Sequence, residues 1–333
     1  MSDSLPEKPK RRPRYVGRNP RHFSEKYKEH TPTRYAEDIA KVLASGKTPA
    51  GAHRPVMVRE ILEILAPQPG ELAVDCTLGF GGHAIALLAA LQPGGRLIGL
   101  DVDPMELPKT EARLRALGFG PETLSVQRMN YAGLAKILPT PADLILADLG
   151  TSSMQIDNPA RGFTYKYEGP LDLRMNPHRG QPASALLASL DEQELAQLLL
   201  ENADEPAAYS IAHAIRQTTV TTTVQLATIV RQTGAVDASV RRVFQALRIA
   251  VNDEFAALET FLRNLPLCLK PGGRAAILTF HSGEDRRVKK AFQSGERDGA
   301  YAAVAHEVLR PTPKERCDNP RSNSAKLRWA RRA

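Results

Sequence analysis

The segment DCTLGFGGH, residues 75–83, decides the fold of this chain. It follows the apolar run LAV at 72–74 and leads into the apolar helical pattern HAIALLAAL at 83–91. Gly79, Gly81 and Gly82 allow the backbone to bend tightly and to come close to a bound ligand. The order of strand, glycine-rich turn and helix predicts one βα unit of a ligand-binding sheet, although the spacing differs from GxGxxG.

Similar units repeat on the C-terminal side of this segment. Helical patterns at 83–91 and 104–118 separate apolar runs that we interpret as buried strands at 72–77, 96–103, 123–130 and 143–150. A further strand is expected at 274–282. Because near-continuous apolar strands that alternate with helices are typical of parallel sheets covered on both faces, we expect an α/β fold with a doubly wound, mostly parallel sheet.

The region between the fourth and fifth strands has only helical patterns. We expect an inserted helical, substrate-recognition domain at 181–235, between two parts of the sheet domain at 51–180 and 236–333. Ser189 and Glu192 have the spacing of a capping box at the start of one helix. The stretch 240–262 carries two stripes at helical spacing. We predict one apolar stripe (Val240, Phe244, Leu247, Val251, Phe255, Leu258) and one polar stripe that forms a solvated face (Arg241, Gln245, Arg248, Asn252).

The 333 residues, of which 42% are hydrophobic and 25% charged, are enough to bury a large core and exclude a disordered chain or a collagen-like fibre. No stretch approaches the roughly 18 apolar residues of a membrane-spanning helix. The first forty residues have charges where a signal peptide needs an apolar run. The three cysteines are far apart, so neither a disulfide framework nor a zinc site is expected. We therefore expect a cytoplasmic protein with no membrane partner and no bound metal.

The net charge of +8 is unevenly distributed along the chain. Residues 1–34 have 10 Lys/Arg and 4 Asp/Glu, and residues 286–333 have 13 and 5, whereas residues 35–285 have 22 and 28. An acidic body with two basic ends is expected where the ends contact a polyanion, although basic tails can also be merely solvated. The first 50 residues show no apolar periodicity, and we interpret them as a flexible basic arm.

Acidic residues follow several of the predicted strands. Asp101 and Asp103 end the second strand, where an acid can bind a ribose diol. This position and the glycine turn favour an adenosine-containing ligand, either a dinucleotide or S-adenosylmethionine, over a purely structural turn. Asp75 at the end of the first strand suits a ligand with an amino group, and Tyr131 after the third could cover an adenine. Asp148 follows the fourth strand at the same edge of the sheet.

The chain resembles one family of RNA-modifying enzymes along most of its length. Seven segments occur in the family's order: HRPVMVREILEIL, DCTLGFGGH, GLDVDP, DLGTSSMQIDNPARGFTYKYEGPLDLRMNP, FQALRIAVNDE, PGGRAAILTFHSGEDRRVKKAF and NPRSNSAKLR. Together they are similar to the small-subunit ribosomal RNA cytosine-N4 methyltransferases, the RsmH or MraW family. The resemblance runs from about residue 53 to 328. The fourth of these segments, residues 148–177, is the most specific to the family.

The resemblance implies a Rossmann-like class I methyltransferase with S-adenosyl-L-methionine as methyl donor. It also implies that the substrate is a cytosine in the decoding region of 16S rRNA, within the small ribosomal subunit. Residues that match the family's donor-binding positions are Gly81, Gly82, His83, Asp101, Tyr131, Asp148 and Gln155. Tyr131 replaces the family's usual phenylalanine and keeps an aromatic ring.

Four segments depart from the family pattern. Gly283 replaces a leucine, Asn323 replaces an arginine, residues 237–242 lack a His-Pro pair, and residues 202–205 replace YGEE. We expect these departures to lie away from the donor site, in parts that face RNA.

Two residues are candidates for a role in the chemistry. Asp148 could accept a hydrogen bond from the cytosine amine, although it could equally serve the donor. His281 could accept a proton near neutral pH or be a hydrogen-bonded structural residue.

Several basic residues are expected to contact rRNA phosphates. We expect these among Arg161, Lys166, Arg174, Arg179, Arg321, Lys326 and Arg328. A methyltransferase for another RNA, and a ribosome-assembly protein that binds the donor without turnover, are the alternative functions.

Overall fold

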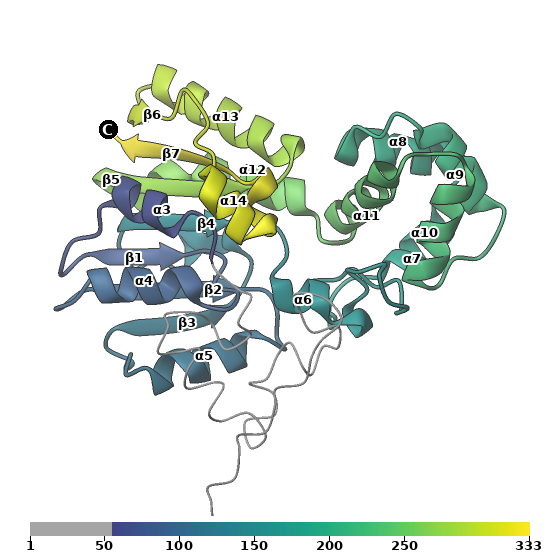
Figure 1. Ribbon diagram of the computed structural model, residues 1–333. Coiled ribbons are helices and arrows are strands. Elements are labelled where there is room, and N and C mark those ends of the chain that lie inside the picture. Colours follow the sequence, from purple (N-terminus) through teal and green to yellow (C-terminus); the bar gives the residue numbers. More distant parts are fainter. Residues whose placement is uncertain (1–54) are drawn as a thin grey trace, which may run out of the picture. The chain divides into compact units, whose positions relative to one another are not determined.

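The fold is organised around a seven-stranded sheet, seen in a computed structural model that describes residues 55–333 (Figure 1). The strand order is β3-β2-β1-β4-β5-β7-β6. The strands are β1 (Leu72–Asp75), β2 (Arg96–Asp101), β3 (Leu124–Arg128), β4 (Ala142–Asp148), β5 (Leu269–Thr279), β6 (Tyr301–Val304) and β7 (Lys326–Arg332). The first five are parallel, whereas β7 runs antiparallel to β5 and β6 antiparallel to β7. The predicted doubly wound, mostly parallel sheet is confirmed.

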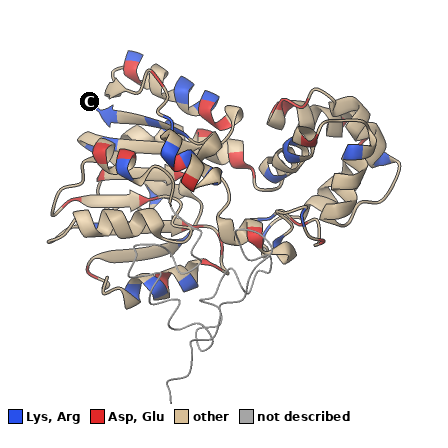
Figure 2. Ribbon diagram, in the orientation of Figure 1, with Lys and Arg blue, Asp and Glu red and all other residues tan. Residues whose placement is uncertain are grey.

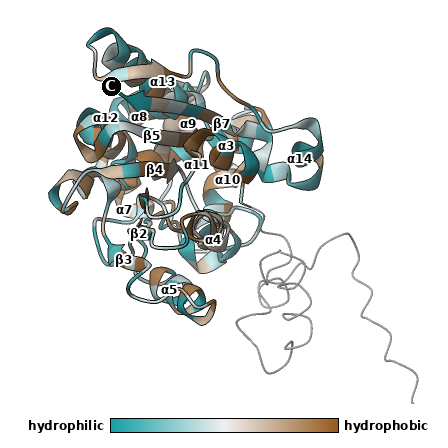
Figure 3. Cartoon of the chain, turned by 90° about the vertical axis from the view of Figure 1, so that its left-hand side faces the viewer, coloured by the Kyte–Doolittle hydropathy of each residue, from teal (hydrophilic) through white to brown (hydrophobic). Residues whose placement is uncertain are grey.

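Alternation of side chains along the strands divides the core into two layers. In β4, Leu144 and Leu146 pack on one face of the sheet, and Ile145 and Ala147 on the other. The first face is covered by α3 (Val58–Leu65), α4 (Gly82–Ala90) and α5 (Leu107–Ala116). The second is covered by α12 (Glu254–Cys268) and α13 (Ser282–Arg297). The α4 helix is nearly all apolar, as its colour in Figure 3 shows.

Five of the described helices between β4 and β5 share a hydrophobic core of their own. These helices are α7 (Ala183–Ser189), α8 (Glu192–Ala203), α9 (Ala208–Arg216), α10 (Thr223–Gln232) and α11 (Asp237–Val251). Val240, Phe244 and Leu247 of α11 belong to this core, so it continues beyond residue 235. The predicted capping box at Ser189 is wrong: Asp191 caps α8 instead, and Glu194 is its reciprocal partner. Ser189 still belongs to α7, so its backbone cannot form the cap of the next helix.

The stretch 240–262 is two helices and not one. The α11 helix ends at Val251, and Asp253 has a left-handed backbone with φ 50° before α12 begins. The single apolar stripe predicted across this stretch is therefore wrong, because the break turns the second half onto the sheet, where Leu258 belongs to a different core from Phe244. The polar stripe is not a solvated face throughout either: Arg241 is exposed, but Arg248 and Asn252 are half-buried and bonded to other residues.

The basic C-terminal segment adds two strands to the sheet that the sequence interpretation did not include. Figure 2 shows its Lys and Arg residues on α13, β7 and the short helix α14 (Pro313–Asp318). The predicted basic arm at 1–50 lies outside the described residues. Within residues 55–333, no helix is both long and apolar enough to span a membrane.

Candidate active site

The glycine turn lies at the carboxyl edge of the sheet and is held from two sides. Gly81 is buried, has φ 80° and precedes α4, where an added Cβ would lie 3.2–3.3 Å from Thr110 and Leu114. A Cβ at Gly82 would lie 2.9 Å from the Pro55 ring. Both positions therefore need glycine, and the turn presents backbone rather than side chains to the space above the strands.

Asp101 bonds this turn to the end of β2. Its Oδ2 accepts the Gly79 N–H at 2.8 Å, and its Oδ1 accepts the Asp103 N–H at 2.9 Å. Burial raises the pKa of the Asp101 carboxyl, while these two backbone donors oppose the rise. Each carboxylate oxygen can accept more than one hydrogen bond, so the same group can still bind a diol.

Asp75 and Asp148 lie at the tips of the neighbouring strands β1 and β4. Asp75 is 1% exposed, and burial raises its pKa to about 6. Burial likewise raises the pKa of Asp148 to about 7, and the charge of Glu284 adds to the rise. The Asp148 backbone is fixed by its N–H, which donates to Thr77 Oγ1 at 2.7 Å.

The Asp148 carboxyl is partly exposed, and one of its oxygens lacks a hydrogen-bond partner among the described residues. Its side chain is 26% exposed, so part of it is accessible to a ligand. Its Oδ1 is nevertheless buried and has no hydrogen-bond partner among the described residues. A buried acceptor without a partner costs about 1–3 kcal/mol, which a donor such as an amine N–H would recover.

His83 completes this group from the first turn of α4. The ring is 7% exposed, its Nε2 lies 2.9 Å from the Val56 carbonyl oxygen, and its Nδ1 lies 3.6 Å from Asp148 Oδ2. Because a carbonyl only accepts, Nε2 must carry the proton and Nδ1 is left as an acceptor in the neutral ring. Burial lowers the pKa of His83, which favours this neutral form.

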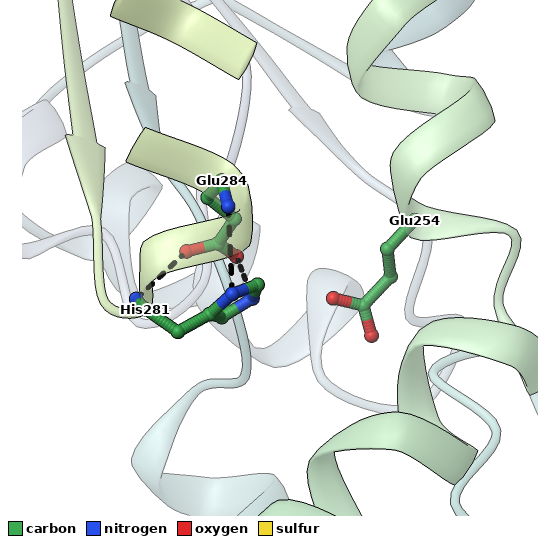
Figure 4. A group of neighbouring side chains, drawn as sticks. All are labelled: Glu254, His281 and Glu284. Carbon is green, nitrogen blue, oxygen red and sulfur yellow. Dashed lines mark hydrogen bonds and ion pairs between the residues drawn. The ribbon is translucent and has the colours of Figure 1, made fainter. Parts of the chain in front are cut away.

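A second polar group lies at the start of α13 (Figure 4). His281 caps the helix, with Nδ1 accepting the Glu284 N–H at 3.4 Å, while Glu284 Oε2 accepts the Phe280 N–H at 2.8 Å. His281 Nε2 lies 3.1 Å from Glu284 Oε1. Burial acts to raise the pKa of the Glu284 carboxyl. Hydrogen bonding with His281 and the charge of that ring act in the opposite direction and keep this pKa below its ordinary value. His281 is therefore placed as a helix cap beside a buried carboxylate.

Glu254 approaches the same group from α12, and one potential ligand atom each of Glu254, His281 and Glu284 lies within 4.8 Å of the others. Such a set could hold a metal ion. Both Glu254 oxygens, however, accept from Arg248, at 2.8 and 3.0 Å. Because a bidentate guanidinium already provides the positive charge at Glu254, we interpret the group as an ion-pair network.

The side chains of Tyr131 and Gln155 are both in contact with other protein groups. The Tyr131 ring packs edge-on against Phe261 at 5.3 Å between centroids, and burial raises its pKa. Gln155 is 5% exposed, and both ends of its amide are bonded: Oε1 accepts the Ser152 N–H, and Nε2 donates to Asp103. Its side chain therefore orients the segment after β4.

The Asp103 carboxylate is the buried group to which both Gln155 and Arg161 donate hydrogen bonds. It is 2% exposed, and its Oδ2 also accepts from Arg161 Nη1 at 2.7 Å. Arg161 in turn donates to the carbonyl oxygens of Arg174 and Met175, at 3.2 and 2.8 Å. This pair connects the end of β2 to the segment 161–175 without reaching the surface.

Two of the selected cations are buried and therefore not open to rRNA phosphates, while the expectation that several of the set contact rRNA stays a prediction. Arg161 and Arg328 are 5% and 4% exposed, and Arg328 Nε donates to Asp285 at 2.6 Å. Arg174, Lys326 and Arg321 are also paired, with Asp172, Asp285 and Asp157. Lys166 and Arg179 are exposed and have no ion pair among the described residues.

Two of the four segments that depart from the family pattern are in contact with each other. Glu205 is fully buried and accepts from Ser239 Oγ at 2.9 Å and Arg242 Nε at 2.5 Å, so segments 202–205 and 237–242 are in contact. Gly283 belongs to the first turn of α13, where an added Cβ would lie 3.2 Å from His281 Nδ1. Nothing in the structure explains Asn323, which is exposed.

Sequence reasoning did not single out Glu254 or Thr77, and it placed Arg248 on a solvated face instead of in an ion pair with Glu254. Arg248 and Glu254 lie on opposite sides of the break between α11 and α12, so no single helical period brings them together. The signal that could have found them is the string RIAVNDE, in which a charged pair brackets an Asn-Asp turn.

The carboxyl groups at this edge of the sheet suit a ligand that carries positive charge. Three carboxyl groups, Asp75, Asp101 and Asp148, surround a turn that presents backbone, and burial raises the pKa of each. A ligand with positive charge would stabilise their ionised forms. This is the electrostatic setting that a sulfonium with a neighbouring ammonium group requires.

Comparison with known proteins agrees with the resemblance in the sequence. A profile of the MraW methylase family matches residues 50–333. "Ribosomal RNA small subunit methyltransferase H 2" of Alkaliphilus metalliredigens is 48% identical over 99% of this chain and 100% of its own length. "Ribosomal RNA small subunit methyltransferase H 1" of Lachnoclostridium phytofermentans is 47% identical over 97% and 93%. The first alignment also covers most of the N-terminal arm. With a family match over residues 50–333 and near-full-length relatives, the chain belongs to the MraW methylase family.

Proposed function

We propose that this protein transfers the methyl group of S-adenosylmethionine to the N4 amine of a cytosine in the decoding region of 16S rRNA. Family membership and the printed names of the relatives support methyl transfer to small-subunit ribosomal RNA. The observation that carries the catalytic part is the buried Oδ1 of Asp148 at the tip of β4, which has no hydrogen-bond partner in the part of the chain that the structure describes.

The residues around the glycine turn fit the donor. The Gly81–Gly82 backbone leaves room for close approach, and Asp101 would bind the ribose diol beside it. Asp75 and His83 supply negative charge and a fixed neutral ring at the same edge. When bound, S-adenosylmethionine supplies an electrophilic methyl group on a sulfonium. Gln155 would contribute by orienting the segment after β4, and Tyr131 would provide an aromatic wall.

Asp148 is the group that we assign to the acceptor amine. The N4 lone pair of cytosine is delocalised into its ring and is a poor nucleophile. A carboxylate that accepts a hydrogen bond from this amine localises the lone pair and orients it for in-line attack. With a pKa of about 7, Asp148 is partly ionised at neutral pH and can then take the proton that leaves nitrogen.

His83 provides the next acceptor for that proton. Its Nδ1 lacks hydrogen because Nε2 donates to Val56, and it faces Asp148 Oδ2 at 3.6 Å. A small movement of either side chain would make this a hydrogen bond. His281, the other candidate, caps α13 and holds Glu284, whose charge adjusts the pKa of Asp148.

The test is to incubate the protein with labelled donor and unmethylated small subunits and then to map the modified nucleotide. Label at N4 of one decoding-region cytosine supports the proposal. Label in a different RNA supports the first alternative, and donor binding without label supports a non-catalytic assembly protein. Because the substrate is ribosomal RNA, we also propose a cytoplasmic location.

A further inference from the structure

The position of the His281 ring depends on a second aromatic residue. Phe255, the second residue of α12, lies with its ring centroid 5.9 Å from that of His281 and tilted by 54°. On another side, the Arg287 guanidinium carbon lies 3.5 Å from the centroid of the Phe255 ring. Arg287 is itself fixed, since its Nε donates to Glu259 at 2.8 Å and its Nη1 to the Gly283 carbonyl at 3.2 Å.

The residue that replaces the family's leucine lies against this ring. A Cβ built on Gly283 would be 2.7 Å from Cζ and 3.2 Å from Cε1 of Phe255, and 3.2 Å from Nδ1 of His281. Side-chain atoms essentially never come as close as 2.7 Å, so a leucine could not occupy position 283 beside Phe255 without moving one of the two rings. Gly283 is the second residue of α13, and its backbone needs no left-handed φ. Backbone conformation therefore does not explain the glycine, whereas the Phe255 ring does.

We propose that Phe255 is a positioning residue for His281, and that Gly283 is the compensating residue that makes room for it. Phe255 fills the space above Gly283 and packs near the imidazole, whose Nδ1 accepts the Glu284 N–H and whose Nε2 lies 3.1 Å from Glu284 Oε1. Both are polar contacts of the ring nitrogens, and Phe255 adds an aromatic contact to the ring itself.

The consequence for the reaction rests on the proposed function. His281 holds Glu284, and the charge of Glu284 raises the pKa of Asp148. A displaced His281 ring would shift Glu284 relative to Asp148 and would change turnover more than donor binding. In this proposal Phe255 and Gly283 act through His281.

A double-mutant cycle tests the proposal with the full-length protein. The variants are Gly283→Ala, Phe255→Leu and the two combined. Alanine is the better helix former, so in the absence of the ring it should be neutral or stabilising at position 283. We expect Gly283→Ala alone to lower kcat about tenfold, with the donor KM changed by less than about twofold. In the Phe255→Leu background, the same alanine should leave kcat unchanged or raise it, because leucine lacks the Cζ atom with which the new methyl collides.

A spectroscopic readout separates this inference from the proposed function. The ring current of Phe255 acts on the imidazole protons of His281, which can be assigned with His281→Gln. Phe255→Leu and Gly283→Ala should both move the His281 resonances. Phe292→Leu is the matched control, because Phe292 lies on the buried face of the same α13 helix and packs against Tyr301. It should lower thermal stability and leave the His281 resonances in place.

Additive effects of the two substitutions on kcat, or His281 resonances that do not respond to Phe255→Leu, would overturn the proposal. If Gly283→Ala does not fold while the double variant does, the clash is supported directly. If neither alanine variant folds, the response of His281 to Phe255→Leu decides. A wild-type protein that transfers no methyl group would contradict the proposed function but not the positioning of His281, which the resonances report independently.

Discussion

His83 Nδ1 faces Asp148 Oδ2 at a distance of 3.6 Å, while Nε2 of the same ring lies 2.9 Å from the Val56 carbonyl. The carbonyl fixes the proton on Nε2, so the nitrogen that faces Asp148 is an acceptor. Among residues 55–333, the carboxyl at the tip of β4 thus has one buried oxygen without a hydrogen-bond partner and an acceptor nitrogen near its other oxygen. This relationship makes Asp148 the centre of the proposed chemistry.

Replacement of this carboxyl should remove turnover and spare the donor. We expect Asp148→Asn to lower the rate of methyl transfer at least about 100-fold, because an amide of the same shape cannot take the proton from the amine. Donor affinity, measured by calorimetry, should change by less than about fivefold. A variant with near-native turnover and donor affinity would exclude Asp148 from the reaction.

The pH dependence of turnover follows from the raised pKa of Asp148. Only the ionised carboxylate accepts the proton, so the single-turnover rate should rise as the pH increases through about 7 and then level off. Glu284→Gln removes a negative charge that adds to this rise, so the midpoint should move to lower pH. A midpoint that moved upward, or a rate that fell over this range, would contradict the assignment.

The same raised pKa should make the wild-type protein less stable at alkaline than at acidic pH. The folded-state pKa of Asp148 lies above the ordinary value near 4, so between about pH 4 and 7 the folded state binds more protons than the unfolded state. The contribution to the free energy of unfolding is therefore lost as the pH rises through this window. Asp148→Asn, which stays neutral, should raise the free energy of unfolding at pH 8 by about 1–2 kcal/mol. Denaturant unfolding at pH 5 and pH 8 checks the sign, and equal effects at both values would refute it.

Much of the fold could be predicted because its signals are local. The glycine turn and the apolar strands β1 to β4 each lie within a few residues, and their order gives the parallel sheet. The sequence interpretation failed where contacts are distant in the chain. Nothing near Arg328 indicates that it is buried against Asp285, and nothing near Arg161 indicates Asp103.

The same distinction applies to the candidate site. Asp101 and Asp148 could be identified because they end strands, and the edge of a parallel sheet brings strand ends together. Arg248 and Glu254 could not, because a left-handed residue, Asp253, separates their helices and changes the direction of the chain. Charge type alone did not distinguish cations in ion pairs from those open to solvent.

The buried pair of Asp103 and Arg161 should be essential for stability. Arg161→Met leaves a carboxylate that is 2% exposed without its cation, and we expect a loss of about 3 kcal/mol in the free energy of unfolding. Arg59→Met is the matched control, because its pair with Glu63 has side chains that are 82% and 59% exposed. That variant should change stability by less than about 0.5 kcal/mol in the same denaturant titration. Equal losses in the two variants would show that burial of the Asp103 pair has no special effect.

An exposed cation near the segment after β4 should contribute to RNA binding. Lys166→Glu is expected to weaken binding to small-subunit RNA and to reduce the slope of log affinity against log salt by about 1 or more. Arg96→Glu is the control, because Arg96 is exposed at the start of β2, at the opposite edge of the sheet from the candidate site. If both variants change the slope equally, binding is directed by net charge and not by this surface.

The most direct test of the central claim is to map the methyl group that the protein transfers. Unmethylated small subunits, labelled donor and either wild-type protein or Asp148→Asn are incubated, and the 16S rRNA is digested and analysed by mass spectrometry. The account predicts label on N4 of a single decoding-region cytosine with the wild-type protein and almost none with the variant. Label on another atom or another RNA, or equal label with both proteins, would contradict it.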